Sequence, residues 1–213
     1  MALSSERISE NLARVRAAVG EQVQVLAAIK YLPPSDLPAL AAGGATLVGE
    51  NRAQELESKQ DEHGALFSDW HFIGQLQSRK VRLIAPRVSL IHSVCTESAL
   101  RELQRHAPVG LEVLLEVNVA REAGKSGIEP EQLDAYIERC PVPVAGLMTM
   151  PPLGSGESSR RWFAGLHELA AARGLRELSM GTSQDYVVAA EEGATIIRLG
   201  RALYEWSSAR ATR

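Results

Sequence analysis

The chain has 213 residues, 45% of them hydrophobic and 23% charged, a balance typical of one folded globular domain. Its 23 basic and 26 acidic side chains give a net charge of −3, so no general positive field exists to attract nucleic acid or an anionic membrane. Cys95 and Cys140 are too few for a disulfide framework and lack the spacing of a zinc site, and no apolar run reaches the roughly 18 residues of a membrane span. We therefore expect a cytoplasmic protein that has no metal site and no nucleic-acid or membrane partner.

Helical and strand patterns alternate along the chain. Ile8–Val19 has apolar residues at helical spacing, and Val23–Lys30 is a short apolar run that stops before Pro33 and Pro34, as a buried strand would. Seven further strands are predicted at 46–49, 70–74, 90–94, 112–118, 144–148, 178–181 and 195–200. Helices are predicted near 35–42, 51–62, 75–85, 96–106, 130–139, 158–173 and 184–192.

Strict alternation of strand and helix implies a parallel sheet, and eight strands favour a closed barrel over an open sheet. The predicted fold is thus a single α/β domain, a (β/α)8 TIM barrel with an extra N-terminal helix, over residues 1–206. Residues 207–213 are expected to form a flexible tail.

Polar residues stand where the predicted strands end, and in a (β/α)8 barrel these ends form the active face. Lys30 is the most distinctive, because an amine at the end of an apolar strand becomes a nucleophile toward aldehydes when its pKa is depressed. The alternative is a lysine that reaches solvent past Pro33. His71 is a second candidate, and its alternative is a core histidine hydrogen-bonded to backbone.

The last two strand ends are candidates for a phosphate site. Leu178–Ser183 joins a strand to a helix through small residues, and a second glycine, Gly200, ends the eighth strand. A serine N-cap with a tight turn explains the first segment equally well. Arg198, inside the eighth strand, must either face a polar ligand or form a buried ion pair with a carboxylate such as Glu50.

Several blocks in a fixed order carry a family resemblance across nearly the whole chain. They are Ala-Ile-Lys30, Gly49-Glu-Asn51, Trp70-His-Phe-Ile-Gly74, Lys125-Ser-Gly127, Gly146-Leu-Met148, Leu178-Ser-Met-Gly181 and Arg198-Leu-Gly200. In this order the sequence resembles the pyridoxal phosphate homeostasis proteins, whose fold is similar to the N-terminal barrel of alanine racemase. The resemblance implies that the cofactor is pyridoxal 5′-phosphate (PLP).

The resemblance also implies roles for individual residues. Lys30 is the expected Schiff-base lysine, and Arg198 is expected to face the pyridine nitrogen, which weakens the electron sink of the cofactor. The expected phosphate contacts are Ser179 and the backbone around Met180, Gly200 and Arg201. Asn51, His71 and Met148 are expected to line the ring. Arg201 departs from the family, which usually has a small hydroxyl residue at this position.

The function implied by the resemblance is intracellular PLP homeostasis, with little or no catalytic turnover and no catalytic residue assigned. In racemases of this fold a second domain supplies the opposing tyrosine base, and this sequence contains no such domain. The alternatives are a PLP-dependent amino-acid racemase that uses the same lysine, and a PLP-independent barrel that binds a phosphorylated metabolite. Expected partners are PLP and apo forms of PLP-dependent enzymes, with the chain itself a monomer.

Overall fold

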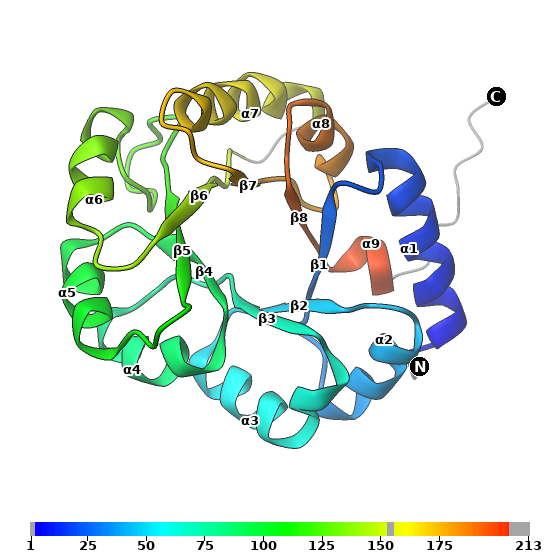
Figure 1. The fold of residues 1–213 in the computed structure, drawn as a ribbon. Coiled ribbons are helices and arrows are strands. Elements are labelled where there is room, and N and C mark those ends of the chain that lie inside the picture. Colours follow the sequence, from blue (N-terminus) through cyan, green and yellow to red (C-terminus); the bar gives the residue numbers. More distant parts are fainter. Residues whose placement is uncertain (1–2, 153–155, 205–213) are drawn as a thin grey trace.

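A computed structural model describes residues 3–152 and 156–204. Its centre is a closed barrel of eight strands in sequence order, in which every neighbouring pair is parallel. The strands are β1 (Gln24–Ala28), β2 (Leu47–Glu50), β3 (Asp69–Phe72), β4 (Leu90–Val94), β5 (Glu112–Glu116), β6 (Val144–Met148), β7 (Glu177–Ser179) and β8 (Ile196–Leu199). Pairing of β1 with β8 closes the ring (Figure 1). The predicted (β/α)8 fold is confirmed.

Helices form a ring outside the strands (Figure 1). The α-helices are α1 (Ser5–Val19), α2 (Leu37–Ala42), α3 (Ala53–His63), α4 (Val81–Ile84), α5 (Glu97–His106), α6 (Leu133–Arg139), α7 (Gly156–Ala171), α8 (Tyr186–Glu191) and α9 (Arg201–Tyr204). Short 3₁₀ helices are η1 (Pro34–Asp36), η2 (Gly64–Leu66), η3 (Ser78–Lys80), η4 (Ala85–Arg87) and η5 (Pro130–Gln132). No described helix is long and apolar enough to cross a membrane.

The extra N-terminal helix is present and begins three residues earlier than its apolar pattern indicated. Ser4 caps α1 by accepting a hydrogen bond from the Arg7 N–H at 3.4 Å, and Gly20 ends it at a φ of 87°. Ile8 and Leu12 are among the apolar side chains that the helix buries against the barrel.

Two other helical segments differ from the sequence pattern. The predicted helix 75–85 divides into η3, α4 and η4, and α4 ends at Ile84, two residues before Pro86, which lacks the N–H that a continuing helix needs. The sequence pattern missed α9, whose four residues are too few to show a helical period. The predicted tail, 207–213, lies outside the described residues.

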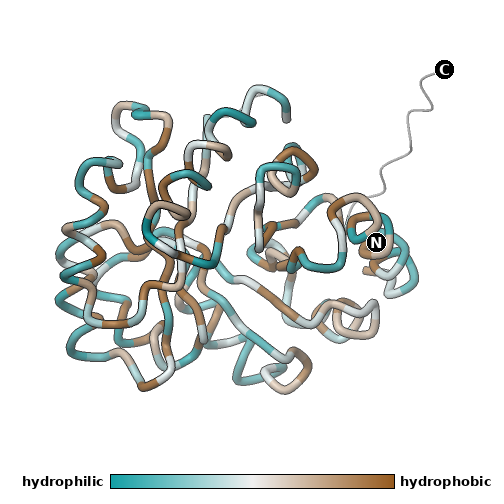
Figure 2. The backbone as a smooth tube through the Cα atoms, turned by 45° about the horizontal axis from the view of Figure 1, so that its top comes forward, coloured by the Kyte–Doolittle hydropathy of each residue, from teal (hydrophilic) through white to brown (hydrophobic). Residues whose placement is uncertain are grey.

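The apolar core has two layers. One lies inside the barrel and consists of Leu26, Leu47, Leu90, Leu114, Ala145, Met148 and Ile196. The larger one lies between the strands and the helices, where alternate strand residues such as Val48 and Ile91 meet the apolar faces of the helices. Hydrophilic and hydrophobic stretches accordingly alternate along the chain (Figure 2). Side chains thus fill the barrel at this level, and a ligand site belongs at its C-terminal end.

The packing of β6 against β7 predicts a marked difference between two glycine substitutions. In Gly146→Ala the new Cβ would lie 1.8 Å from the Glu177 carbonyl oxygen on the neighbouring strand, so we expect a loss of about 1–3 kcal/mol in the free energy of unfolding. In the control Gly165→Ala, on α7, no atom lies within 4 Å of the new Cβ, and we expect a gain of up to about 1 kcal/mol. Urea denaturation of both variants measures the difference, and equal stabilities would contradict the packing.

Candidate functional site at the C-terminal end of the barrel

Lys30 leaves the barrel between the ends of two other strands. Leu26 and Ala27 of β1 pair with Arg198 and Leu199 of β8, while Ala28 pairs with Gly49 of β2. Continued past the strands, this register sets Asn51 level with Lys30, whereas Gly200 is level with Ala28, two residues before Lys30. The strand pairing thus places Asn51 beside Lys30, and Gly200 beside the last residue of β1.

The Lys30 side chain is half-buried and has no carboxylate partner in the described part of the chain. Its Nζ lies 4.7 Å from the centroid of the Tyr31 ring, a cation–π contact at the rim of the barrel. Tyr31 itself is 79% exposed, so this amine can be reached from solvent. The position of the Lys30 side chain therefore agrees with the alternative of a lysine that faces solvent. Its amine nevertheless lies at the open end of the barrel.

A second lysine, Lys59 of α3, is fully buried behind Lys30. Its Nζ donates hydrogen bonds to the Ile29 carbonyl oxygen at 2.8 Å and to Glu50 Oε2 at 2.6 Å. The other carboxylate oxygen of Glu50 accepts from the N–H groups of Asn51 and Arg52 at 2.6 and 3.1 Å. Because both groups are completely buried, each charge needs the other. The pair connects the ends of β1 and β2 just before Lys30 and Asn51.

Asn51 carries a buried side-chain oxygen, Oδ1, without a hydrogen-bond partner among the described residues. The segment after β3 passes close to the Asn51 backbone, since a Cβ at Gly74 would lie 2.0 Å from the Asn51 carbonyl oxygen. An unsatisfied buried oxygen in a native site suits a polar ligand or water that supplies the missing donor.

Arg198 is buried inside the barrel, and it makes no ion pair within the described ranges. Its NH1 donates to Ser179 Oγ at 2.5 Å, and its NH2 donates to the Thr149 carbonyl oxygen at 3.0 Å and contacts Met150 Sδ at 2.8 Å. Burial lowers the pKa of Arg198 to about 10, so the guanidinium is still charged at neutral pH. The alternative of an Arg198–Glu50 ion pair is wrong, because Glu50 binds Lys59 instead.

A cavity of about 30 Å³ lies next to Arg198, between the loops that follow β6 and β7. Residues that line it include Met150 and Pro151 from the first loop and Gly181, Thr182 and Asp185 from the second. Gly181 has a φ of 92°, a conformation that suits glycine, and its carbonyl oxygen accepts from the Arg198 N–H at 3.0 Å. This turn fixes the second loop over the guanidinium.

The residues predicted to hold phosphate fall into two groups. Ser179 is fully buried, and its hydroxyl contacts Arg198 and His92. The Met180 side chain is buried in the outer core, and its N–H donates to the Ile196 carbonyl oxygen. By contrast, Gly200 and the exposed Arg201 lie at the open end, where the nearby Ser183 Oγ accepts from the Ala202 N–H at 3.1 Å.

The residues predicted to line the ring also differ in depth. Asn51 is at the open end, and Met148 ends β6 with its side chain in the interior apolar cluster. His71 lies inside the barrel with 4% exposure and contacts two side chains, with Nε2 3.2 Å from Asp69 Oδ2 and Nδ1 3.0 Å from His92 Nε2. The alternative of a core histidine bonded to backbone is therefore wrong in its partners, which are both side chains.

Sequence reasoning missed two buried residues that organise this site, His92 and Lys59. Each could have been identified from the periodicity of its strand or helix in the sequence. His92 shares an inward strand face with Leu90, and Lys59 lies on the same helix face as the buried Ala53 and Leu56. A polar residue on an apolar face identifies a buried group that needs a partner.

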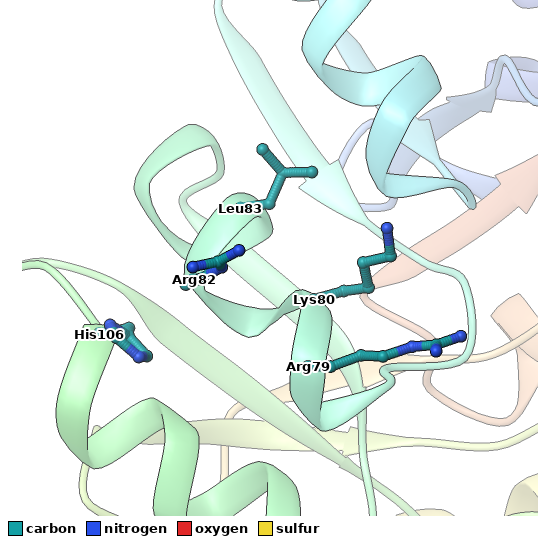
Figure 3. A pocket seen from close by; sticks show the side chains of 5 residues that line it. All are labelled: Arg79, Lys80, Arg82, Leu83 and His106. Atoms are coloured by element: carbon teal, nitrogen blue, oxygen red, sulfur yellow. The ribbon is translucent and has the colours of Figure 1, made fainter.

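A separate hollow of about 730 Å³ lies on the outside of the barrel, lined by Arg79, Lys80, Arg82, Leu83 and His106. Figure 3 shows that four of these side chains come from the segment around η3 and α4, whereas His106 comes from the end of α5. The hollow is basic and contains none of the predicted site residues. It is distinct from the convergence of Lys30, Asn51 and Arg198.

Comparison with known proteins identifies the class of this barrel. The model of the family described as "Alanine racemase, N-terminal domain" matches residues 3–207. The alanine racemase of Corynebacterium glutamicum superposes with a TM-score of 0.77 at 15% identity, over 100% of this chain and 64% of that one, which shows the shared fold. The chain is thus a barrel of the alanine racemase N-terminal domain family.

Relatives in sequence define the group more closely. The chain is 40% identical to the pyridoxal phosphate homeostasis protein of Aquifex aeolicus, over 93% of this chain and 96% of that protein. It is 38% identical to the protein of that name in Pseudomonas aeruginosa, over 92% and 94% of the two chains. PipY of Synechococcus elongatus, solved with PLP bound, has a TM-score of 0.83 and 33% identity, over 92% of this chain and 99% of PipY. The chain belongs to the pyridoxal phosphate homeostasis protein family, and the predicted resemblance is confirmed.

The buried Lys59–Glu50 pair predicts a large loss of stability on removal of one partner. In Lys59→Met the carboxylate of Glu50 stays buried without its cation, so we expect the free energy of unfolding at pH 7 to fall by about 3–5 kcal/mol. The same change at Lys80, which forms no ion pair in the described structure, is the matched control and is expected to shift it by about 0.5 kcal/mol or less. Urea denaturation measures both, and a small effect at Lys59 would contradict the assigned pair.

Proposed function

We propose that this chain binds PLP at the C-terminal end of its barrel, holds it as a Schiff base on Lys30, and serves intracellular PLP homeostasis. The observation that carries the proposal is the strand register, which sets Asn51 level with an accessible amine and Gly200 level with Ala28, two residues before that amine. When bound, PLP supplies an aldehyde carbon that condenses with an amine with loss of one water, and an electron-withdrawing ring.

The residues at the open end suit the cofactor chemically. Arg198 is a donor that faces the mouth without a carboxylate partner in the described part of the chain, which suits an unprotonated pyridine nitrogen. Asn51 Oδ1 still needs a hydrogen-bond donor, which a ring hydroxyl can supply. In this proposal Arg198, Asn51 and Met148 contact the ring, while His71 acts from beneath.

For the phosphate we propose the turns that follow β7 and β8. The Ser179 hydroxyl and the Met180 N–H have partners inside the barrel, so in this proposal the contacts come from residues 181–183 and from Gly200 and Arg201. Ser179 then supports Arg198 from below. The exposed Arg201 adds a cation to this end of the barrel, where the family usually has a small hydroxyl residue.

The proposed role is storage or delivery of PLP, with slight turnover or none. A charged guanidinium at the pyridine nitrogen does not protonate the ring and therefore weakens the electron sink that racemisation uses. The matched part of the Corynebacterium racemase is 64% of its length, so the rest of that enzyme has no counterpart in this chain. We further propose a cytoplasmic monomer that passes PLP to apo enzymes.

The Schiff base is tested by absorbance and by mass. Purified protein mixed with PLP is expected to absorb in the near ultraviolet to violet, and borohydride is expected to fix the label on the peptide that contains Lys30. Lys30→Ala should lose both signals, whereas Lys80→Ala, a lysine in the outer hollow, should keep them. A label that persists in Lys30→Ala would refute the assignment of the Schiff base to Lys30, and wild-type protein that stays colourless would refute PLP binding and leave the PLP-independent barrel.

Racemase activity is the remaining alternative and has its own test. We expect α-proton exchange of amino acids in D₂O, followed by NMR with PLP-loaded protein, to be far slower than the roughly 1 per second or more of ordinary enzymes. Exchange at that rate, abolished in Lys30→Ala, would assign the chain to catalysis instead of storage.

A further inference from the structure

A line of polar side chains crosses the otherwise apolar interior of the barrel. From β8 and β7 it passes to β4 and β3, and its members are Arg198, Ser179, His92, His71 and Asp69. We call these five residues the interior relay. The four donor–acceptor distances, in this order, are 2.5, 2.8, 3.0 and 3.2 Å.

The two ends of the interior relay are fixed chemically. Arg198 has only donors, so Ser179 Oγ must accept from it. At the other end, burial alone would raise the pKa of Asp69, but hydrogen bonds from His71 and Ser89 lower it below its ordinary value. Asp69 is therefore an ionised carboxylate that only accepts, and His71 Nε2 must carry the hydrogen that faces it.

With the ends fixed, only one arrangement of hydrogens remains for neutral histidines. Burial, together with the charge of Arg198, lowers the pKa of His92 well below its ordinary value, so His92 is neutral. In a neutral His71 the single ring hydrogen is on Nε2, so Nδ1 accepts from His92 Nε2. His92 Nδ1 then accepts the hydroxyl hydrogen of Ser179. Every bond points from Arg198 toward Asp69.

Asp69 lies at the N-terminal end of the barrel, opposite the proposed cofactor site. It is the first residue of β3, and its side chain is 43% exposed. A hollow of about 370 Å³ opens there, lined by Arg16, Glu21 and Asp69 among others. The interior relay therefore joins the solvent at one end of the barrel to the guanidinium at the other.

We propose that the interior relay positions Arg198, and that the Asp69 carboxylate sets the direction of every hydrogen bond up to the guanidinium. His92 and His71 are thus positioning residues. The part of the proposal that concerns cofactor binding rests on the proposed function, in which Arg198 faces the PLP ring. The direction of the bonds does not rest on it and can be measured in protein without PLP.

The substitution Asp69→Asn tests the direction. Oδ1 of Asp69 accepts from the Trp70 N–H at 2.8 Å and from the Ser89 hydroxyl at 2.6 Å. Since the backbone N–H can only donate, the oxygen of an asparagine stays on that side and its NH₂ group faces His71 Nε2. His71 and His92 must then both carry their hydrogens on Nδ1. Ser179 Oγ would accept twice, and its own hydrogen would lose its acceptor.

Protein labelled with ¹⁵N-histidine gives the readout, because long-range ¹H–¹⁵N spectra report which ring nitrogen is protonated. In wild-type protein without PLP we expect His92 and His71 both to be protonated on Nε2, and in Asp69→Asn both on Nδ1. The control Ser89→Ala keeps the carboxylate and should keep the wild-type pattern. A wild-type pattern with His92 protonated on Nδ1, or no change at His92 in Asp69→Asn, would overturn the proposal.

Titration of PLP by absorbance tests the link to the cofactor. We expect Asp69→Asn to weaken PLP binding by about tenfold, the effect of roughly one lost buried hydrogen bond, and Ser89→Ala to leave it unchanged. A switch of both histidines with unchanged affinity would overturn the positioning of Arg198. Wild-type protein that fails to bind PLP, while its histidines switch as expected, would refute the proposed function and leave the direction of the relay standing.

Discussion

A permanent positive charge inside the barrel is the constraint on which the arrangement of polar groups depends. The guanidinium of Arg198 is buried, and among the described residues no carboxylate lies within ion-pair distance of it. An unpaired charge in an apolar interior is costly unless hydrogen bonds compensate for it. Ser179 and the Thr149 carbonyl oxygen supply such bonds, and the Gly181 carbonyl oxygen holds the Arg198 backbone. The charge of Arg198 is therefore held in place by neutral acceptors.

The two lysines beside β1 show how burial separates chemical roles. Lys59 is fully buried, and its two hydrogen bonds are to groups at the ends of β1 and β2, while Glu55 Oε2 of its own helix lies 3.8 Å from its Nζ. Lys30, one residue beyond the carbonyl group that Lys59 binds, is accessible and contacts only an exposed ring. A rigid, fully satisfied cation thus fixes the base from which a free amine extends. Such support from neighbouring groups is what a covalent binding site needs in order to present its nucleophile in one place.

Much of the fold was predictable from the sequence, because each strand is a compact apolar run and each long helix has an apolar face. The eight strands and the helix that precedes them follow from these periods. The division of 75–85 into short helices and the four-residue helix α9 did not follow, since short elements depend on tertiary contacts such as the hydrogen bond from Asn11 Nδ2 to the Leu203 carbonyl oxygen.

The location of the candidate site was predictable from the sequence, but the depth of its residues inside the barrel was less so. Strand ends identified Lys30, Asn51 and Gly200, and the strand register sets Asn51 level with Lys30 and Gly200 level with Ala28. The strand periodicity shows which residues point inward but not how deep they lie, so it did not show that Ser179 and His71 are buried inside the barrel. Their partner His92 was missed for the same reason, because its role depends on side chains that are distant in sequence.

Closure of the ring by β1 and β8 also has a consequence for folding during synthesis on the ribosome. During synthesis β1 leaves the ribosome long before β8, and until residues 196–199 emerge its outer edge has no hydrogen-bonding neighbour. The end of β1, just before Lys30, therefore gains its second neighbouring strand last, through the strand pairing with the largest sequence separation in the barrel. A nascent chain interrupted before that point would expose an apolar strand edge.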